Sequence, residues 1–172
     1  MSESKPSLYQ RLGGIYAIAA VVDELIERIM VDPRLNKNPL VDEAHHRVPK
    51  AGFKYLVTEL VGMATGGPQV YTGRSMKDSH AHLRISATEW AAFLDDVQQT
   101  LSKFEVPAAE QAGLMSTIDN VLLFRCVQIV RKLMKQDRRI GIFCNLSPSA
   151  LADEHFFPQF LDFMRENRDL AG

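Results

Sequence analysis

Two histidines separated by one residue have the clearest capacity for chemistry in this sequence. His80 and His82 lie in the stretch GGPQVYTGRSMKDSHAHLRIS, which runs from residue 66 to residue 86. A neutral imidazole can offer a lone pair to a metal ion near physiological pH. A solvated or hydrogen-bonded histidine beside a turn is the commoner outcome, so the residue types alone leave both interpretations open.

The other potential metal ligands do not have the spacing of a zinc site. Cys126 and Cys144 are far apart, and the sequence has neither a CxxC nor an HExxH motif. His45 and His46 form a second pair in a polar stretch, where solvation is the simpler explanation. One axial histidine on an apolar helical scaffold would suit a haem pocket, although the bare sequence does not single that out.

The composition predicts a soluble, cytoplasmic protein. The 172 residues contain 20 Lys and Arg against 21 Asp and Glu, which gives a net charge of -1. This balance argues against nucleic acid or an anionic membrane as a partner, because both favour a basic surface. Two cysteines are too few for a disulfide scaffold. No apolar run has the length of a signal peptide or a membrane span.

Helical periodicity dominates the elements that would position the histidines. The patterns predict long helices at residues 15–32, 49–65, 86–104 and 107–138. In the first of these, apolar residues recur at 3.6-residue spacing opposite charged ones. Ser86 and Glu89, three residues apart, form a capping box that predicts a helix start. The polar stretch at residues 33–47 is loop-like.

The last third of the sequence has a different pattern. Residues 138–147, RRIGIFCNLS, form a compact apolar run typical of a strand, and residues 153–167 have a helical apolar face. A single strand leaves unpaired backbone groups, which are costly when buried. The strand therefore either pairs with another copy of the chain or belongs to an incomplete sheet.

Residues 7–115 resemble a group I truncated haemoglobin. The resemblance lies in SLYQRLGG, the amphipathic helix after it, GGPQVYTGRSMKDSHAHLRIS, and EWAAFLDDVQQTLSKFEVPAAEQ. It implies a mainly α fold, a two-over-two helical sandwich with paired glycines at its turns, and a globin domain over residues 1–115. It also implies haem b as cofactor, with His80 as the proximal iron ligand and His82 pointing elsewhere.

The same resemblance implies which further residues contact the haem. Arg74 and Lys77 would pair with the haem propionates, although simple solvation explains them equally well. The other cofactor-binding residues that it implies are Phe53, Leu56, Val57, Tyr71, Met76, Leu83 and Ile85.

The distal ligand pocket that the resemblance implies is apolar; it consists of Leu25, Ile26, Phe53 and Val57. Ile26 stands where many relatives have a tyrosine that donates to bound oxygen, and Leu56 stands where some have an iron-binding histidine. The usual aromatic pair falls near Asn38 and Pro39. Tyr55 and His46 are the nearest polar candidates. Such a pocket predicts faster oxygen loss and weaker discrimination against carbon monoxide than in a tyrosine-bearing relative.

Residues 116–172 resemble an internal piece of an EAL-type cyclic-di-GMP phosphodiesterase domain. The likeness lies in CNLSP and LADEHFFPQFLDFM, and it implies a C-terminal helix-strand-helix fragment whose first helix could complete the globin. Asn145 matches a metal-holding asparagine of that family. A divalent cation wants about six oxygen ligands, and this sequence lacks the family's carboxylate ligands. Phosphodiesterase activity is therefore not expected, and the strand edge leaves either poor order or self-association open for residues 139–172.

Two functions from different classes remain. The first is a haem protein that reversibly binds oxygen, nitric oxide or carbon monoxide at iron ligated by His80. Nitric-oxide dioxygenase-like activity could follow, but it would require an unidentified reductase and polar distal groups. The second is a non-catalytic interaction or sensor module with a degenerate EAL-derived tail. Haem uptake by the purified protein separates the two.

Overall fold

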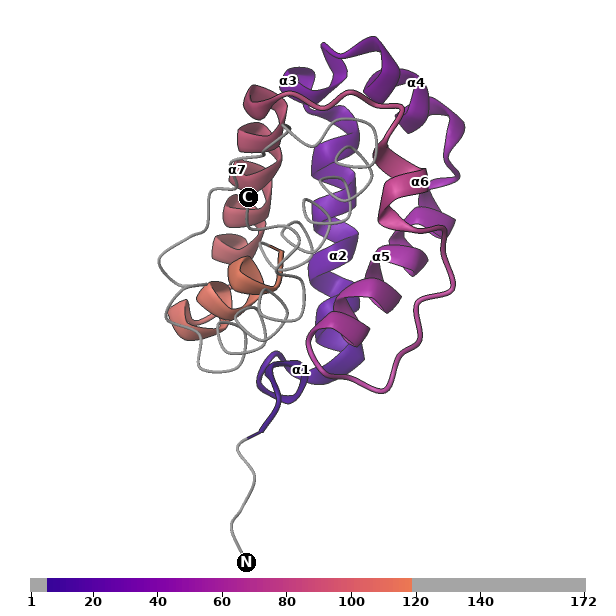
Figure 1. The fold of residues 1–172 in the computed structure, drawn as a ribbon. Helices are drawn as coiled ribbons and strands as arrows, with labels where there is room; N and C mark the ends of the chain where they lie inside the picture. Colours follow the sequence, from indigo (N-terminus) through magenta and orange to yellow (C-terminus); the bar gives the residue numbers. More distant parts are fainter. Residues whose placement is uncertain (1–5, 119–172) are drawn as a thin grey trace, which may run out of the picture. The chain divides into compact units, whose positions relative to one another are not determined.

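The computed structural model of the chain describes residues 6–118. The chain divides into a first unit, residues 1–111, and a second unit, residues 112–172. The first unit contains α1 (Leu8–Arg11), α2 (Gly14–Val31), α3 (Pro33–Asn36), α4 (Pro39–Arg47), α5 (Lys50–Ala64), α6 (Met76–His80) and α7 (Ala87–Lys103) (Figure 1). Residues 108–118 are also helical. Within residues 6–118 all regular structure is helical, which confirms the mainly α prediction for this part of the chain.

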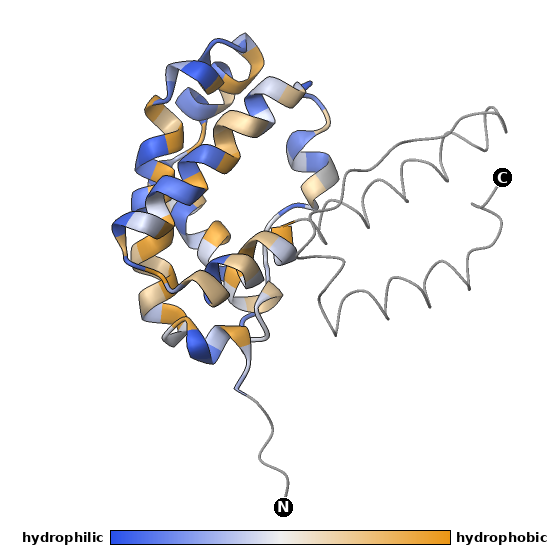
Figure 2. Ribbon diagram, turned by 90° about the vertical axis from the view of Figure 1, so that its left-hand side faces the viewer, coloured by the Kyte–Doolittle hydropathy of each residue, from blue (hydrophilic) through white to orange (hydrophobic). Residues whose placement is uncertain are grey.

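Helix α2 forms the centre of the first unit. It packs most extensively against α5 and, on another side, against α7 (Figure 1). The buried side chains of α2 are Ile18, Val22, Ile26 and Ile29, which confirms the predicted apolar stripe. Hydrophobic and hydrophilic residues share each long helix (Figure 2). Burial of each isoleucine stabilises the fold by about 1.5–3 kcal/mol relative to exposure.

Consecutive glycines allow α1 to turn sharply into α2. Gly13 and Gly14 have φ angles of +87° and +75°, a region that glycine enters without a Cβ penalty. Tyr9 of α1 donates its backbone N–H to the carbonyl of Thr65 at 2.9 Å, just beyond α5. A Cβ on Gly67 would collide with the ring of Tyr9. The two predicted glycine turns therefore lie against one another, and together they join α1 to the end of α5.

The predicted loop at residues 33–47 is wrong, because this stretch forms α3 and α4. Pro33 and Pro39 each begin a helix, where the missing N–H costs nothing. The residues before them, Asp32 and Asn38, accept hydrogen bonds from the backbone N–H two residues later, at 2.7 and 3.0 Å. Polar composition suggests a loop, but these N-caps and prolines start helices instead.

The predicted capping box at the start of α7 is confirmed. The Ser86 hydroxyl accepts from the Glu89 N–H at 3.3 Å, and the Glu89 carboxylate accepts from the Ser86 N–H at 2.7 Å. The following turn carries Trp90, whose ring centroid lies 5.1 Å from that of Phe93 with the planes tilted by 34°. Helix α7 therefore starts from a satisfied end and presents an aromatic pair in its first turns.

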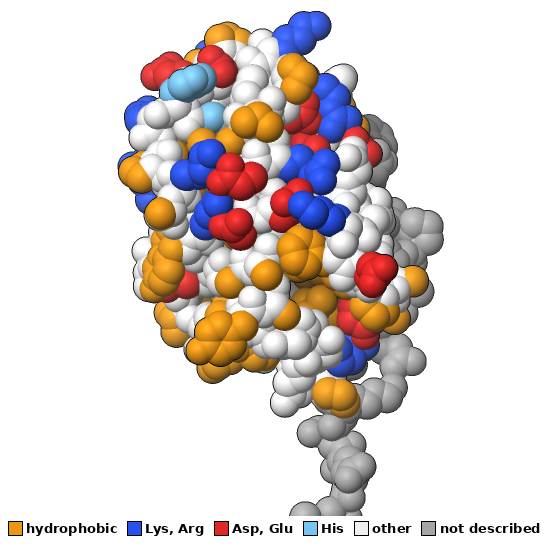
Figure 3. All heavy atoms as spheres, turned by 180° about the vertical axis from the view of Figure 1, so that it is seen from behind, with side chains coloured by type: hydrophobic (Ala, Val, Ile, Leu, Met, Phe, Trp, Pro, Cys, Tyr) orange, Lys and Arg blue, Asp and Glu red, His pale blue; other side chains and the backbone are white. Residues whose placement is uncertain are grey.

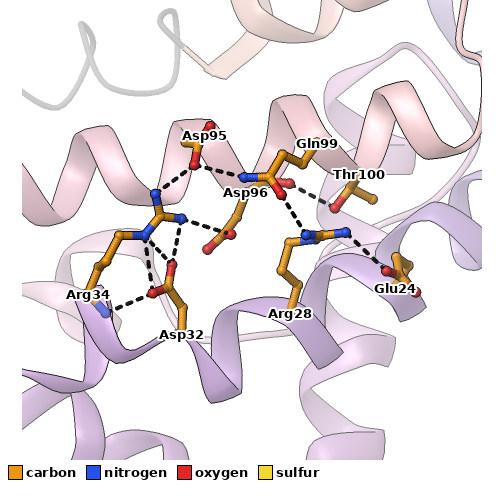
Figure 4. Close-up of polar contacts among 8 residues, drawn as sticks. All are labelled: Glu24, Arg28, Asp32, Arg34, Asp95, Asp96, Gln99 and Thr100. Atoms are coloured by element: carbon orange, nitrogen blue, oxygen red, sulfur yellow. Dashed lines mark hydrogen bonds and ion pairs between the residues drawn. The ribbon is translucent and has the colours of Figure 1, made fainter.

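An ion cluster joins α3 to α7, and we call it the α3–α7 junction; it consists of Asp32, Arg34, Asp95 and Asp96 (Figure 4). The Arg34 guanidinium donates to Asp95 at 2.6 Å, to Asp32 at 2.7 Å and to Asp96 at 3.2 Å. The side chain of Asp96 is 3% exposed and that of Arg34 is 46% exposed. One half-exposed cation therefore bridges carboxylates of which two are buried.

Burial, and next the neighbouring Asp32, raise the pKa of Asp96 to about 6. The pKa of Asp32 is lowered instead, because hydrogen bonds from Arg34 outweigh the effect of its own burial. Asp96 therefore keeps its proton to a higher pH than Asp32 does. Beside them Arg28 donates to Gln99 at 2.8 Å and extends the polar contact between α2 and α7 (Figure 4).

Charges elsewhere on the described surface are interleaved. Lys54 of α5 pairs with Asp23 and Glu27 of α2 at 2.6 Å each. Figure 3 shows acidic and basic side chains side by side on the rear face, with hydrophobic side chains below them. In residues 6–118 no helix has the length and apolar character needed to cross a membrane.

Several predictions lie outside the described residues. These are the strand at 138–147, the helix at 153–167, Asn145, and the part of the helix at 107–138 that follows residue 118. The structure confirms that helix from residue 108 to residue 118.

Candidate functional site

Helix α6 carries His80 as its last residue, and the imidazole is fixed from within the helix. The Nδ1 atom of His80 lies 2.9 Å from the carbonyl oxygen of Met76, one turn earlier. A carbonyl can only accept, so Nδ1 carries the proton and Nε2 carries the lone pair of the neutral ring. This is the tautomer that a metal-binding histidine adopts when its other nitrogen donates to the backbone. The residue as a whole is exposed.

The start of α6 is also locally ordered. Ser75 accepts a hydrogen bond from the Asp78 N–H at 3.1 Å and donates its hydroxyl to the Asp78 carboxylate at 2.7 Å. This arrangement satisfies a backbone donor that a helix otherwise leaves without a partner. A helix of five residues is marginal by itself, so such contacts decide where His80 lies.

The loop before α6 is held against α5. Thr72 donates both its N–H, at 3.0 Å, and its hydroxyl, at 2.7 Å, to the carboxylate of Glu59 in α5. Tyr71 donates its hydroxyl to the Arg74 carbonyl at 2.9 Å. A Cβ on Gly73 would collide with the Tyr71 hydroxyl. The YTGR run therefore folds on itself and needs glycine at its third position.

An apolar cluster connects α5 with the segment after α6. Leu83 is buried in the same cluster as Ile26, and Phe53 and Val57 pack against that cluster. Leu25 packs against it as well. Four residues predicted to line the distal pocket, together with one predicted haem-wall residue, therefore share one apolar region of the first unit.

The helix α5 has an apolar face that protein buries only in part. Its single buried residue is Gly62, whereas Phe53, Leu56 and Val57 are half-buried. Ile26, opposite on α2, is 1% exposed and belongs to the protein core. The α5 side chains thus differ from those of α2, because they keep apolar surface available to a further apolar body.

The remaining predicted site residues occupy varied environments. Tyr71 and Met76 are half-buried, and Arg74 is exposed. Lys77 lies in α6. Ile85 is 41% exposed and lies beyond the apolar cluster defined above. His82 follows α6 in an exposed turn.

The two polar candidates for the distal side are exposed. Tyr55 is 60% exposed, and a hydrogen bond to Glu59 raises its pKa. The side chain of His46 is 79% exposed beside Asp42. Neither side chain is enclosed by the protein.

Two polar residues of α4 and its N-cap have roles that sequence reasoning did not find. His45 is half-buried with its Nδ1 atom 2.7 Å from the Asn36 side-chain oxygen, and burial lowers its pKa. Asn38 contacts Leu83 and Glu89 as well as capping α4. The Asn-Pro dipeptide signals the cap, but no local pattern indicates contacts this distant in sequence.

The described residues contain no cluster of three or more histidine, cysteine, aspartate or glutamate side chains that could hold a bare metal ion. The helical order of the first unit, with a histidine at the end of the short helix between α5 and α7, is that of a globin. Residues 7–123 match the bacterial-like globin family, and the chain belongs to that family. The match runs to residue 123, past the boundary at residue 115 that the resemblance implied for the globin domain.

The chain is similar to group 1 truncated haemoglobins. It is 30% identical to GlbN of Synechocystis sp. over 106 residues, which cover 59% of this chain and 80% of the relative. It is 24% identical to that of Tetrahymena pyriformis over 107 residues, 62% of this chain and 84% of the relative. The crystal structure of the latter in its Fe(III) form superposes with a TM-score of 0.58 at 22% identity, covering 66% of this chain and 92% of that one. The truncated-globin fold is thereby confirmed.

Truncated globins bind haem iron, and the described residues fit such a group in two respects. The Nδ1 atom of His80 lies against a backbone carbonyl, as the non-ligating nitrogen of a metal-binding histidine does. The half-buried apolar side chains of α5 suit a broad, flat, apolar ring. The donor set and the surface beside it are therefore both of the kind that haem requires.

Proposed function

We propose that the chain is a haem protein that reversibly binds a diatomic gas, with His80 as the proximal ligand. The observation that carries this proposal is the orientation of His80 by the Met76 carbonyl, in a chain that belongs to the globin family. The haem iron, when bound, supplies the position at which oxygen, nitric oxide or carbon monoxide binds. The chain's own side chains retain the haem and determine the polarity around the bound gas.

The proximal histidine is the group on which haem retention depends. The hydrogen bond from Nδ1 to Met76 orients the ring and makes Nε2 the more basic donor. Met76 is half-buried and Leu83 is buried, and these apolar residues, near His80 in sequence, would shield the bond from water. Arg74 is exposed and lies in the loop before α6, so its guanidinium can reach an anionic propionate at the edge of the haem.

The distal side chains favour ligand binding without strong retention of oxygen. Leu25, Ile26, Phe53 and Val57 have no side-chain N–H or O–H group. A bound oxygen would therefore lack a hydrogen bond that is worth about 1–3 kcal/mol, or roughly ten- to a hundredfold in affinity. We infer fast oxygen release and weak discrimination against carbon monoxide, a profile that does not favour nitric-oxide dioxygenation.

The test is an absorption spectrum of purified protein loaded with haemin, before and after dithionite and after carbon monoxide. The Soret band should shift at each step. His80→Ala should lose most of the haem, and added imidazole should restore part of the spectrum. His82→Ala is the matched control and should behave as the wild type. Equal loss in both variants would refute His80 as the ligand, and failure to take up haemin would favour the interaction or sensor module.

A further inference from the structure

Asn38 uses every polar atom of its side chain. Its Oδ1 atom accepts from the Leu40 N–H at 3.0 Å and so caps α4. Its Nδ2 atom donates to the Leu83 carbonyl at 2.9 Å and to the Glu89 carboxylate at 3.2 Å. The partners are of opposite kinds, so they determine which end of the amide is oxygen. Asn38 thus links the start of α4 to the chain that follows α6 and to the first turn of α7.

Leu83 transmits this link to the histidine. Its N–H donates to the carbonyl of His80 at 3.0 Å, and its side chain is buried in the apolar cluster. The next residue, Arg84, has a φ angle of +51°, which is uncommon for a residue with a side chain and persists only where its surroundings hold it. Leu83 is therefore fixed at three points: the bond of its N–H, the burial of its side chain, and the bond that its carbonyl accepts from Asn38.

We propose that Asn38 is a positioning residue for His80: through Leu83 it fixes the end of α6, and so the direction of the imidazole. This inference rests on the proposed function, in which that imidazole binds the haem iron. Asn38 acts on protein groups alone. Removal of a group bonded directly to a metal ligand typically weakens a metal site by roughly 10- to 100-fold; Asn38 acts one residue further out, so we expect the low end of that range.

The capping role of Asn38 can be separated from the positioning role. A cap requires only the acceptor Oδ1, and aspartate or serine would cap about as well. The two donor bonds require an amide. Asn38→Asp therefore keeps the shape and the cap but places a carboxylate against the Leu83 carbonyl and the Glu89 carboxylate. Asn38→Ser keeps an acceptor and removes the amide donors without adding charge.

The experiment compares haem-loaded wild type, Asn38→Asp, Asn38→Ser and Ser86→Ala. Ser86→Ala removes the neighbouring cap of α7 and leaves the Leu83 carbonyl bond in place. The readouts are the iron–histidine stretching band of the ferrous protein in resonance Raman spectra and the rate of haem loss to excess apomyoglobin. Both Asn38 variants should shift the band and lose haem about 10-fold faster or more. Ser86→Ala should leave the band at the wild-type frequency.

The outcomes distinguish this inference from the proposed function. A histidine-ligated wild type with an unshifted band in both Asn38 variants overturns the positioning role and leaves the function intact. An equal shift in Ser86→Ala also overturns it, because general loosening of the loop would then suffice. A wild type without a band from histidine ligation refutes His80 as the ligand and ends both. If Asn38→Asp does not fold, Asn38→Ser gives the same decision.

Discussion

The α3–α7 junction and the segment from Tyr71 to Leu83 are held in contrasting ways. In the junction, charged side chains from two helices meet directly, and Arg34 alone bonds three carboxylates. In the segment around α6, the bonds within Ser75–Asp78 and between His80 Nδ1 and Met76 span four residues or fewer. The longer links are uncharged-donor bonds, from Thr72 to Glu59 and from Asn38 to the Leu83 carbonyl. Binding elements are generally drawn from the less stable parts of a fold. We therefore expect variants in the junction to change global stability and variants in the α6 segment to change haem retention.

The largest effect on stability is expected from loss of the bridging cation. Arg34→Met would leave Asp32 and Asp96 buried without their counter-charge. A fully buried pair broken in this way loses about 3–5 kcal/mol; because Arg34 is 46% exposed, we expect a loss of about 2–3 kcal/mol. Urea unfolding measures it. Arg47→Met, at the exposed end of α4, is the control and should change stability by less than about 0.5 kcal/mol.

A pH-dependent effect should follow from Asp96 in the same junction. The folded-state pKa of about 6 lies above the ordinary value of 3.8 for an aspartate, so between these pH values the folded protein binds a proton that the unfolded chain releases. Relative to Asp96→Asn, the wild type should therefore lose stability as pH rises from about 4 to about 6, by on the order of 1–2 kcal/mol. Unfolding curves across this range measure the difference. A difference that increases with pH would contradict the raised pKa of Asp96.

A smaller stability change, with a larger effect on haem, is expected at Gly73. Gly73→Ala would displace the Tyr71 hydroxyl and cost about 1 kcal/mol, while haem loss should become several-fold faster. Gly52→Ala is the matched control, since a Cβ there meets nothing within 4 Å, and it should stabilise α5 by about 0.5–1 kcal/mol. If the rate of haem loss simply followed stability in both variants, the α6 segment would have no separate role in haem retention.

The smallest effect should come from the α2–α5 surface pairs. Lys54→Met removes the contacts with Asp23 and Glu27. Exposed ion pairs contribute about 0–1 kcal/mol and are screened by salt. If Lys54→Met lowered the free energy of unfolding by more than that at physiological ionic strength, the α3–α7 junction would not be the main ionic contribution to stability.

The sequence predicted those elements whose signals are local. The stripe from Ile18 to Ile29 and the box of Ser86 and Glu89 rely on spacing within one helix, and both are confirmed. In the stretch at residues 33–47 polarity outweighed the N-cap and proline signals, so α3 and α4 were missed. Those signals are themselves local, so the error came from giving composition more weight than the caps.

The candidate site divides in the same way. The i, i+4 bond between His80 and Met76 is local, and the YTGR run led to the histidine. Arg34 and Asp95, by contrast, are 61 residues apart, and Asn38 and Leu83 are 45 apart. No periodicity links such residues, so the junction and the positioning contact could be seen only in three dimensions.

The aromatic pair at the start of α7 has an optical consequence. Trp90 is the single tryptophan of the chain, so all tryptophan fluorescence comes from one position, beside Phe93. A folded unit of about 100 residues has a radius of gyration of about 13 Å, a distance over which a porphyrin absorbs that emission efficiently. Fluorescence titration would therefore count occupied protein molecules directly, without any introduced label.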